Sequence, residues 1–196
     1  MVIRAVVFDL DGVLRHFDPE ATADIERRHA LEMGTLLDAA FAEPGLGDVT
    51  TGRITRDTWI SGIGERVGVP AAAVEWGDWP PSVDAEMLTL ADELRARGIT
   101  VAVLTNGTDT IRVEVEAQGI ACRVDHVFNT AEIGHAKPDR RAFEHVLEAL
   151  GLTGPEVVFT DDSPAKLAGA VEVGMHAHAF VGRDDLRQEL VRLGVL

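Results

Sequence analysis

The sequence predicts an α/β fold with a parallel sheet and a small α-helical cap inserted after the first strand. Two observations support this fold class. From residue 99 onward, short runs of β-branched and apolar residues alternate with helical patterns, as in successive βαβ units. About ninety residues separate the first strand from the next, and structureless insertions of that size are rare in compact domains. We therefore expect the intervening segment to form helices of its own.

Each predicted strand is a short apolar run bounded by polar residues or glycine. The runs cover residues 5–8, 99–104, 124–128, 156–160 and 175–180. Helices are predicted between them at residues 82–97, 139–150 and 163–173, and each is followed by a glycine, the residue that most readily ends a helix. In the last helix, Ser163 is expected to cap the N-terminus and Val171 to face the core.

The predicted cap begins at Asp18-Pro19, where a capping residue and a proline indicate the start of a helix. A second helix is predicted at residues 55–67, and the stretch between Gly68 and Ser82 is interpreted as the connection back to the core. The apolar face of the later part of this first helix is assigned to Met33, Leu36, Leu37, Ala40 and Phe41.

These boundaries divide the chain into two units. The core comprises residues 1–14 and 82–196, and the helical cap comprises residues 15–81. Trp76 and Trp79 lie in the return connection, where we interpret them as packing residues.

The composition limits the partners of the chain. Its 196 residues are 46% hydrophobic, enough for one sizeable core and a smaller appended unit. A formal net charge of -15 would repel nucleic acid and anionic membranes, so we expect a small-molecule partner and neither a nucleic acid nor a membrane. The single cysteine, Cys122, forms no internal disulfide, and no signal or spanning segment is apparent. These features predict a cytoplasmic monomer or homodimer.

Polar side chains of complementary kinds follow the predicted strands. They are Asp9 and Asp11 after the first strand, Thr105, Asn106 and Gly107 after the second, Asp161 and Asp162 after the fourth, and Lys137 in the loop before residues 139–150. Because the carboxyl ends of parallel strands lie at one edge of a sheet, we expect these groups to converge. Lys137 and Lys166 are the only lysines beside 16 arginines, so both positions require an explanation.

The residue types indicate the chemistry of such a site. Clustered carboxylates suit a hard cation, and Mg²⁺ binds through one or two carboxylates, waters and phosphate oxygens. A phosphate dianion would be repelled by these acids unless a divalent ion and a lysine neutralised the site. Each group alone also fits an ordinary turn or surface position, but their joint occurrence at strand ends favours a catalytic site with Mg²⁺ as cofactor.

The chain resembles the haloacid dehalogenase-like (HAD) hydrolase superfamily in four motifs that occur in the family's order. They are Asp9-Leu10-Asp11-Gly12-Val13, Leu104-Thr105-Asn106-Gly107, Lys137-Pro138-Asp139 and Phe159-Thr160-Asp161-Asp162-Ser163. The resemblance covers nearly the whole chain. It implies a Rossmann-like core, and the position of the insert resembles the helical C1-type cap of the first subfamily.

This resemblance implies a Mg²⁺-dependent phosphatase that acts on a small phosphorylated metabolite. Asp9 would be the nucleophile that forms an aspartyl-phosphate, and Asp11 would be the general acid and then the base. Lys137 would stabilise charge on the nucleophile and the phosphate. The transferring phosphoryl oxygens would be held by Thr105, Asn106 and Gly107. Mg²⁺ would be bound by Asp9, the backbone carbonyl of Asp11 and Asp162, with Asp161 as a second ligand or a more distant acceptor.

Two further residues stand out beside these motifs. Lys166 occupies a position where relatives with an Asp-Asp pair usually carry Asn or Asp. Its ammonium either points outward or pairs with Asp161 or Asp162 and weakens metal binding. His16 leaves the catalytic loop for the cap, where residues often border the substrate. It is predicted either to act as an extra acid or to form a hydrogen bond at the hinge, and we favour the hinge.

Three other functions are considered. A 2-haloacid dehalogenase would use an aspartate nucleophile on carbon but would need neither a second aspartate nor Mg²⁺, so Asp11 argues against it. A sugar phosphomutase would use the same groups and stays open. A non-catalytic protein that accepts phosphate at an aspartate is disfavoured by the cap and by Asp11, since a phosphate acceptor for signalling does not require fast hydrolysis.

Overall fold

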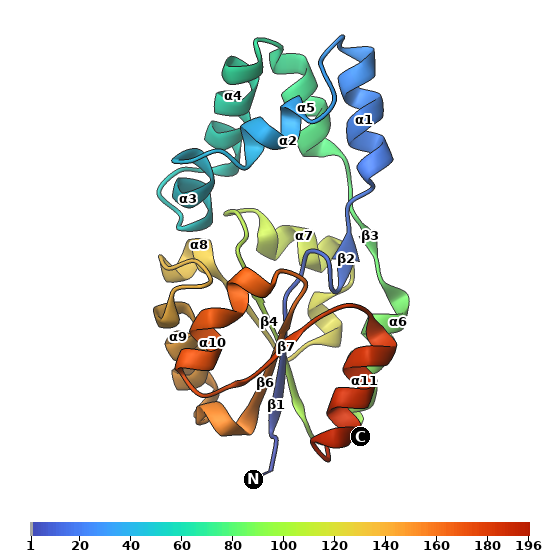
Figure 1. The fold of residues 1–196 in the computed structure, drawn as a ribbon, viewed down its shortest axis with the longest axis vertical. Coiled ribbons are helices and arrows are strands. Elements are labelled where there is room, and N and C mark those ends of the chain that lie inside the picture. The colour runs from blue at the N-terminus through green and yellow to red at the C-terminus, as the bar shows by residue number, and fades with distance from the viewer. Residues whose placement is uncertain (1) are drawn as a thin grey trace.

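The computed structural model describes residues 2–196 and shows a five-stranded sheet with a helical cap beyond one edge of it (Figure 1). The strands of this sheet are β1 (Ala5–Phe8), β4 (Thr100–Thr105), β5 (His126–Asn129), β6 (Val157–Asp161) and β7 (His176–Ala179). Their order is β5-β4-β1-β6-β7, and every neighbouring pair is parallel. This arrangement confirms the predicted α/β fold.

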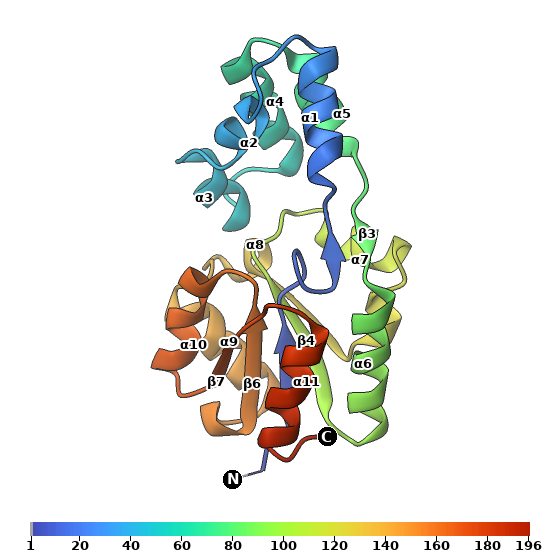
Figure 2. The ribbon, with the colours of Figure 1, turned by 45° about the vertical axis from the view of Figure 1, so that its right-hand side comes forward.

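Helices cover both faces of the sheet (Figure 2). The core helices are α6 (Ala85–Ala96), α7 (Ile111–Ala117), α8 (Thr130–Ile133), α9 (Arg140–Leu150), α10 (Ala168–Glu172) and α11 (Arg183–Arg192). Short 3₁₀ turns are η1 (Ala121–Arg123), η2 (Gly154–Glu156) and η3 (Pro164–Leu167). Within residues 2–196, no helix has the length and apolar character that crossing a membrane requires.

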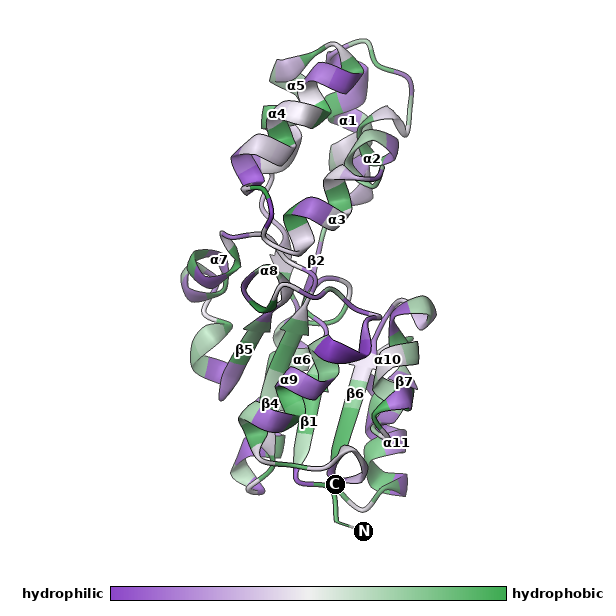
Figure 3. Cartoon of the chain, turned by 90° about the vertical axis from the view of Figure 1, so that its left-hand side faces the viewer, coloured by the Kyte–Doolittle hydropathy of each residue, from purple (hydrophilic) through white to green (hydrophobic). Residues whose placement is uncertain are grey.

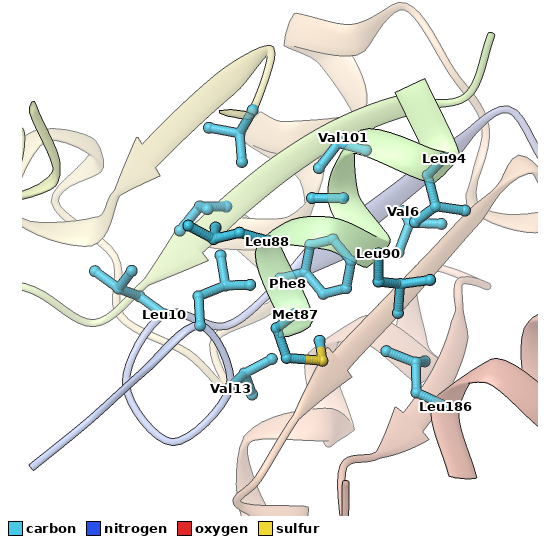
Figure 4. Packing of buried hydrophobic residues seen from close by; sticks show 14 of the residues in the cluster. Val6, Phe8, Leu10, Val13, Met87, Leu88, Leu90, Leu94, Val101 and Leu186 are labelled. Carbon is cyan, nitrogen blue, oxygen red and sulfur yellow. The ribbon is translucent and has the colours of Figure 1, made fainter. Parts of the chain in front are cut away.

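Alternate residues of β1 supply two hydrophobic cores, one on each face of the sheet. Val6 and Phe8 pack with Leu90 of α6 on one face (Figure 4), while Ala5 and Val7 belong to the cluster under α9 and α10 on the other. Burying one large apolar side chain stabilises the fold by about 1.5–3 kcal/mol. Since β1 is buried on both faces, its sequence is a continuous apolar run. Figure 3 shows that β4 and β6 are hydrophobic as well.

The start of α6 differs from the prediction. Ser82 and Val83 form the short strand β3 (Ser82–Val83), and the helix begins after Asp84. The Asp84 carboxylate accepts hydrogen bonds from the N–H groups of Glu86 and Met87, which would otherwise lack partners at the helix end. The residue that caps this helix is therefore Asp84, two residues after the predicted start at Ser82.

The helix predicted at residues 163–173 is divided. Residues 164–167 form the 3₁₀ turn η3, and α10 follows it. Ser163 makes no capping hydrogen bond with its side chain, and its N–H donates to Asp161 instead. Val171 is exposed, so its predicted inward orientation was wrong.

The cap consists of five helices with a hydrophobic cluster of their own. They are α1 (Pro19–Arg28), α2 (Thr35–Ala40), α3 (Gly45–Thr50), α4 (Arg56–Val67) and α5 (Pro70–Asp78). Ile25 of α1, Leu36 of α2 and Ile63 of α4 are buried together in this cluster. Trp59 and Trp76 meet edge to face with ring centroids 5.8 Å apart. The cap therefore has a core separate from those of the sheet.

Several expectations about the cap were wrong. Residues 70–78 form α5 rather than an irregular connection, because Pro70 stands in the first turn, where proline favours a helix. The helix that opens at Asp18-Pro19 ends at Arg28, and the apolar residues assigned to its later face lie in or next to the separate helix α2. Met33, Leu37 and Phe41 are exposed, so only part of that face is buried. Trp79 is exposed as well, so its predicted packing role was wrong.

A two-stranded ribbon joins the cap to the core (Figures 1 and 2). In it, β2 (Arg15–His16) pairs antiparallel with β3, so the chain enters and leaves the cap side by side. This arrangement supports the proposed division into a core and a cap of residues 15–81, with the ribbon as the hinge between them.

Candidate active site

The strand ends that carry the predicted polar groups lie at the edge of the sheet that faces the cap (Figure 2). In the register of β1 and β6, Phe8 pairs with Thr160, so the residues after them, Asp9 and Asp161, emerge next to each other. On the other side of β1, β4 ends at Thr105. The topology thus brings residues far apart in the sequence to one place.

Asp9 is a buried carboxylate with one occupied oxygen and one open oxygen. Its Oδ1 accepts a hydrogen bond from the Leu10 N–H at 2.7 Å and lies 2.8 Å from the Lys137 ammonium. Its Oδ2 is buried and has no hydrogen-bond partner among residues 2–196. Burial alone would raise the pKa of Asp9, but the ammonium groups of Lys137 and Lys166 lower it below its ordinary value. Asp9 is therefore an ionised carboxylate with a free oxygen.

Lys137 neutralises two carboxylates from inside the protein. Its ammonium has no solvent exposure and lies 2.8 Å from Asp9 Oδ1 and 2.7 Å from Asp161 Oδ2. The Asn106 side chain holds this loop in place, since it accepts from the Lys137 N–H at 2.8 Å and donates to the Lys137 carbonyl at 2.9 Å. Lys137 is thus fixed between the end of β1 and the end of β6.

The two aspartates after β6 have different surroundings. Asp161 is fully buried, with Oδ2 on Lys137 and Oδ1 accepting the Ser163 N–H at 2.9 Å. Asp162 is exposed, next to the loop that carries Asp9. Since both Asp161 oxygens are already engaged, the geometry favours Asp162 over Asp161 as the carboxylate open to a ligand.

The donor set fits a hard divalent cation. Asp9, Asp161 and Asp162 can each place one oxygen within 4.8 Å of the others, and such cations prefer carboxylate oxygens. The open, buried Oδ2 of Asp9 supports this fit, because a buried oxygen without a hydrogen-bond partner is costly and a bound cation would give it one.

Gly12 makes room for this cluster, a role that the sequence did not reveal. It has a φ of +86°, and a Cβ built on it would lie 2.1 Å from Oδ2 of Asp162. Any side chain at position 12 would therefore push the Asp162 carboxylate away from Asp9.

Asp11 is held by a buried arginine that sequence reasoning missed. Arg15, only 2% exposed, places Nε 2.5 Å from Asp11 Oδ1 and donates through Nη1 to Glu114 Oε2 at 2.8 Å and Gln118 Oε1 at 3.2 Å. Part of the Asp11 side chain is exposed to solvent, but the surrounding protein excludes much of the water around its carboxyl group. This burial raises the pKa of Asp11 above its ordinary value, although the charge of Arg15 acts in the opposite direction. A raised pKa favours the protonated form that a general acid needs.

Three of the residues assigned to phosphate binding, Thr105, Asn106 and Gly107, lie at the end of β4 and in the loop after it, where Asn106 contacts Lys137. Thr105 is buried at the end of β4, and the Asn106 side chain is occupied by the backbone of Lys137. A Cβ at Gly107 would lie 2.2 Å from Cγ1 of Ile111, which is buried at the start of α7. The backbone N–H groups of this loop, rather than the Asn106 amide, are therefore the donors available to a ligand.

His16 lies in the ribbon and not in the carboxylate cluster. Its backbone pairs with Ser82, and its Nε2 is 3.2 Å from Oδ2 of Asp84, the residue that caps α6. The structure thus places His16 at the hinge.

Lys166 points toward the acidic cluster. Its ammonium lies 3.6 Å from Asp9 Oδ2 and 4.0 Å from Asp161 Oδ1. Burial alone would lower the pKa of Lys166, but the carboxylates of Asp9, Asp161 and Asp162 raise it, so the side chain is a cation. Of the two orientations left open by the sequence, the structure shows the one that pairs with the acids, with Asp9 as the nearer partner.

Comparisons with known proteins agree with this fold. A model of the haloacid dehalogenase-like hydrolase family matches residues 3–174. The chain is 31% identical to Phosphatase MT3486 of Mycobacterium tuberculosis, covering 98% of this chain and 94% of that protein. It is 26% identical to the sesquiterpene phosphatase astK of Aspergillus oryzae, and the match covers 88% of this chain and 87% of that protein.

A solved structure extends the comparison to the fold. It is a HAD family enzyme of Bacteroides thetaiotaomicron in complex with magnesium and inorganic phosphate, with a TM-score of 0.75, 23% identity and coverage of 93% of this chain and 96% of that one. From the family match and the identity to the mycobacterial protein, this chain belongs to the haloacid dehalogenase-like hydrolases.

Proposed function

We propose that this hydrolase is a Mg²⁺-dependent phosphatase that cleaves a small phosphorylated metabolite through an aspartyl-phosphate on Asp9. The observation that carries the proposal is the Asp9 carboxylate, which is ionised, buried and open at Oδ2 beside two ammonium groups. A nucleophile and a counter-charge for phosphate are thus present at one point of the sheet edge.

Mg²⁺ would be held by Asp9, Asp162 and the backbone carbonyl of Asp11. Asp161 would hold Lys137 in place through an ion pair while accepting a hydrogen bond from the Ser163 N–H. When bound, the ion would offset the repulsion between the carboxylates and the phosphate dianion.

In the first half of the reaction, an Asp9 oxygen would form a bond to phosphorus while the ester P–O bond breaks. Asp11 would give its proton to the leaving oxygen, since a free alkoxide is a poor leaving group. Lys137 would stabilise negative charge on Asp9 and on the phosphoryl group.

In the second half, Asp11 would take a proton from water as the water oxygen bonds to phosphorus. The bond between phosphorus and Asp9 would then break, which releases inorganic phosphate and restores the Asp9 carboxylate. Thr105 and the N–H groups of Asn106 and Gly107 would hold the phosphoryl oxygens during both steps, as helix and loop N–H groups commonly do.

The similar proteins support a phosphatase over the alternatives. Phosphatase MT3486 and the sesquiterpene phosphatase are both phosphatases by name, and the Bacteroides enzyme was crystallised with magnesium and phosphate. Asp11 also favours phosphoryl transfer, because a carbon-directed dehalogenase has no need for a second aspartate at that position.

The test is phosphate release from a panel of phosphomonoesters, including sugar, nucleotide and short-acid phosphates, with Mg²⁺ and with EDTA. We expect release with Mg²⁺ on at least one substrate, loss with EDTA, and a reduction of about 10³-fold or more in Asp9→Asn. Absence of phosphate release from the whole panel, or full activity in Asp9→Asn, would overturn the proposal. Transfer of the phosphoryl group within a sugar, without free phosphate, would identify a phosphomutase instead.

A further inference from the structure

Lys166 lies beside the oxygen of Asp9 that is open to a cation. Both partners on Oδ1 of Asp9, the Leu10 N–H and Lys137, leave that oxygen occupied. The Lys166 ammonium faces the other oxygen, Oδ2, at 3.6 Å, a distance that gives charge attraction without a hydrogen bond. The one open oxygen of the nucleophile is therefore also the one nearest to Lys166.

The two lysines of the site differ in their freedom to move. The Lys137 side chain has no exposure and is clamped between two carboxylates at 2.7 and 2.8 Å. The Lys166 side chain is 32% exposed, and its closest carboxylate distances are 3.6 and 4.0 Å. Lys166 can consequently swing toward solvent at small cost, whereas Lys137 cannot.

We propose that Lys166 is a displaceable counter-ion that competes with Mg²⁺ for Oδ2 of Asp9 and so weakens binding of the metal. The inference rests on the proposed function, since it assumes that Asp9 is a metal ligand.

The charges around the cluster give the direction of the effect. Without metal, Asp9, Asp161 and Asp162 face the ammonium groups of Lys137 and Lys166. A divalent ion that enters beside Asp9 meets a like charge at Lys166 and has to displace it or tolerate it, and either requirement lowers affinity. A neutral residue at position 166 removes this requirement, but it leaves the metal-free cluster with less positive charge.

The experiment is calorimetric titration of purified protein with Mg²⁺ and no substrate. The variant is Lys166→Met, which keeps an unbranched apolar stem and offers no charge or oxygen ligand. We expect Mg²⁺ to bind about tenfold or more tightly to Lys166→Met than to the unmodified chain.

Arg97→Met is the matched control, because it also removes one positive charge. Arg97 is half-exposed at the end of α6 and pairs with Glu93, at the edge of the sheet opposite the site. The affinity of Arg97→Met for Mg²⁺ is expected to stay within about twofold of that of the unmodified chain, since a distant exposed charge is screened by salt.

Thermal unfolding supplies an independent measurement. In EDTA, Lys166→Met should unfold at a lower temperature than the unmodified chain, because the carboxylate cluster loses a counter-ion. With saturating Mg²⁺, the variant should gain more stability than the unmodified chain does. Far-ultraviolet circular dichroism verifies that the variant is folded.

The possible outcomes separate the inference from the function on which it rests. Equal or weaker Mg²⁺ binding by folded Lys166→Met, together with a measurable affinity in the unmodified chain, contradicts the competition and leaves the phosphatase proposal intact. No Mg²⁺ binding by either protein overturns the metal site itself, and the competition with it.

Discussion

At the scale of single residues, Arg15 would keep one oxygen of Asp11 free for the proposed proton transfer. The Arg15 guanidinium donates to Oδ1 of Asp11, and arginine stays protonated at all ordinary pH values. A proton carried by Asp11 therefore resides on Oδ2. Because Glu114 anchors the other end of Arg15, the orientation of the acid depends on a helix that follows the second site loop.

The first prediction concerns Arg15→Met. We expect a loss of about 10- to 100-fold in kcat on an alkyl phosphate, whose leaving oxygen needs the proton, and a much smaller loss on nitrophenyl phosphate, whose leaving group does not. Steady-state kinetics with both substrates measure the difference. Asp11→Asn should show the same dependence on the leaving group, and equal losses on both substrates in Arg15→Met would leave Arg15 with a purely structural role.

The sequence predicted the residues of the cluster better than their partners. Asp9, Lys137 and Asp161 follow from their places at strand ends, since a parallel sheet brings those ends together. Arg15 could not be found this way, because its burial depends on Glu114, a residue 99 positions away on a helix with no distinguishing motif.

At the scale of elements, the turn after β1 is shaped for the end of β6. Gly12 adopts a left-handed conformation, and its missing side chain leaves room for the Asp162 carboxylate. This close approach of the two loops brings carboxylates after β1 and β6 close enough to share a cation, as the proposed metal site requires.

The second prediction tests this contact with Gly12→Ala. We expect it to weaken Mg²⁺ binding about tenfold or more, since the new Cβ would displace Asp162. Calorimetric titration measures the affinity. Gly98→Ala is the matched control, because Gly98 has a φ of +79° but open space around it.

Gly98→Ala should lose about 1–2 kcal/mol of folding stability, because alanine is strained in a left-handed conformation, and should keep its affinity for Mg²⁺. If both variants bind Mg²⁺ equally well, the turn after β1 has no special relation to the metal site.

Element prediction succeeded where a periodic pattern was long and failed where structure depends on pairing. The five strands of the sheet were placed within one or two residues. The strands β2 and β3 have two residues each and carry no pattern of their own, so only their mutual pairing reveals them. Met33 and Phe41 are apolar but exposed, because residue type indicates what could be buried and not which surface meets a partner.

At the scale of the whole molecule, the cap contacts the core at a second place away from the ribbon. The Thr130 hydroxyl, on α8, donates to the carbonyl of Thr50 at the end of α3 with a length of 2.7 Å. The Arg56 N–H, at the start of α4, donates to Asp109. A Cβ on Gly52 would lie 2.1 Å from the Ala131 carbonyl oxygen, so the backbones of the cap and the core approach closely here. These contacts hold the cap over the site.

The third prediction is that Thr130→Val loosens this contact. The Thr50 carbonyl would lose its partner at a helix end, which costs about 1–3 kcal/mol if it stays buried. We expect faster amide hydrogen exchange in residues 45–56 and unchanged exchange in α9. Thr89→Val, which removes a hydroxyl bond within α6 alone, serves as the control. Unchanged exchange in residues 45–56 of Thr130→Val would show that this bond does not hold the cap.

The overall arrangement of core and cap was predictable because two signals agreed: a long insert after the first strand and regular βαβ spacing after it. The contacts between the two units were not predictable, since they use single polar side chains such as Thr130 and Asp109 with no periodic pattern. The proposed division into core and cap was drawn from the order of segments alone.

The most direct test of the central claim is chemical identification of the phosphorylated residue. The protein is mixed with a cleavable phosphomonoester and Mg²⁺, quenched in acid during turnover and reduced with borohydride, and its peptides are analysed by mass spectrometry. We predict that reduction marks Asp9 and no other carboxylate, and that Asp9→Asn shows no mark. Turnover of the substrate with an unmarked Asp9, or a mark on Asp11 or Asp162, would contradict Asp9 as the nucleophile.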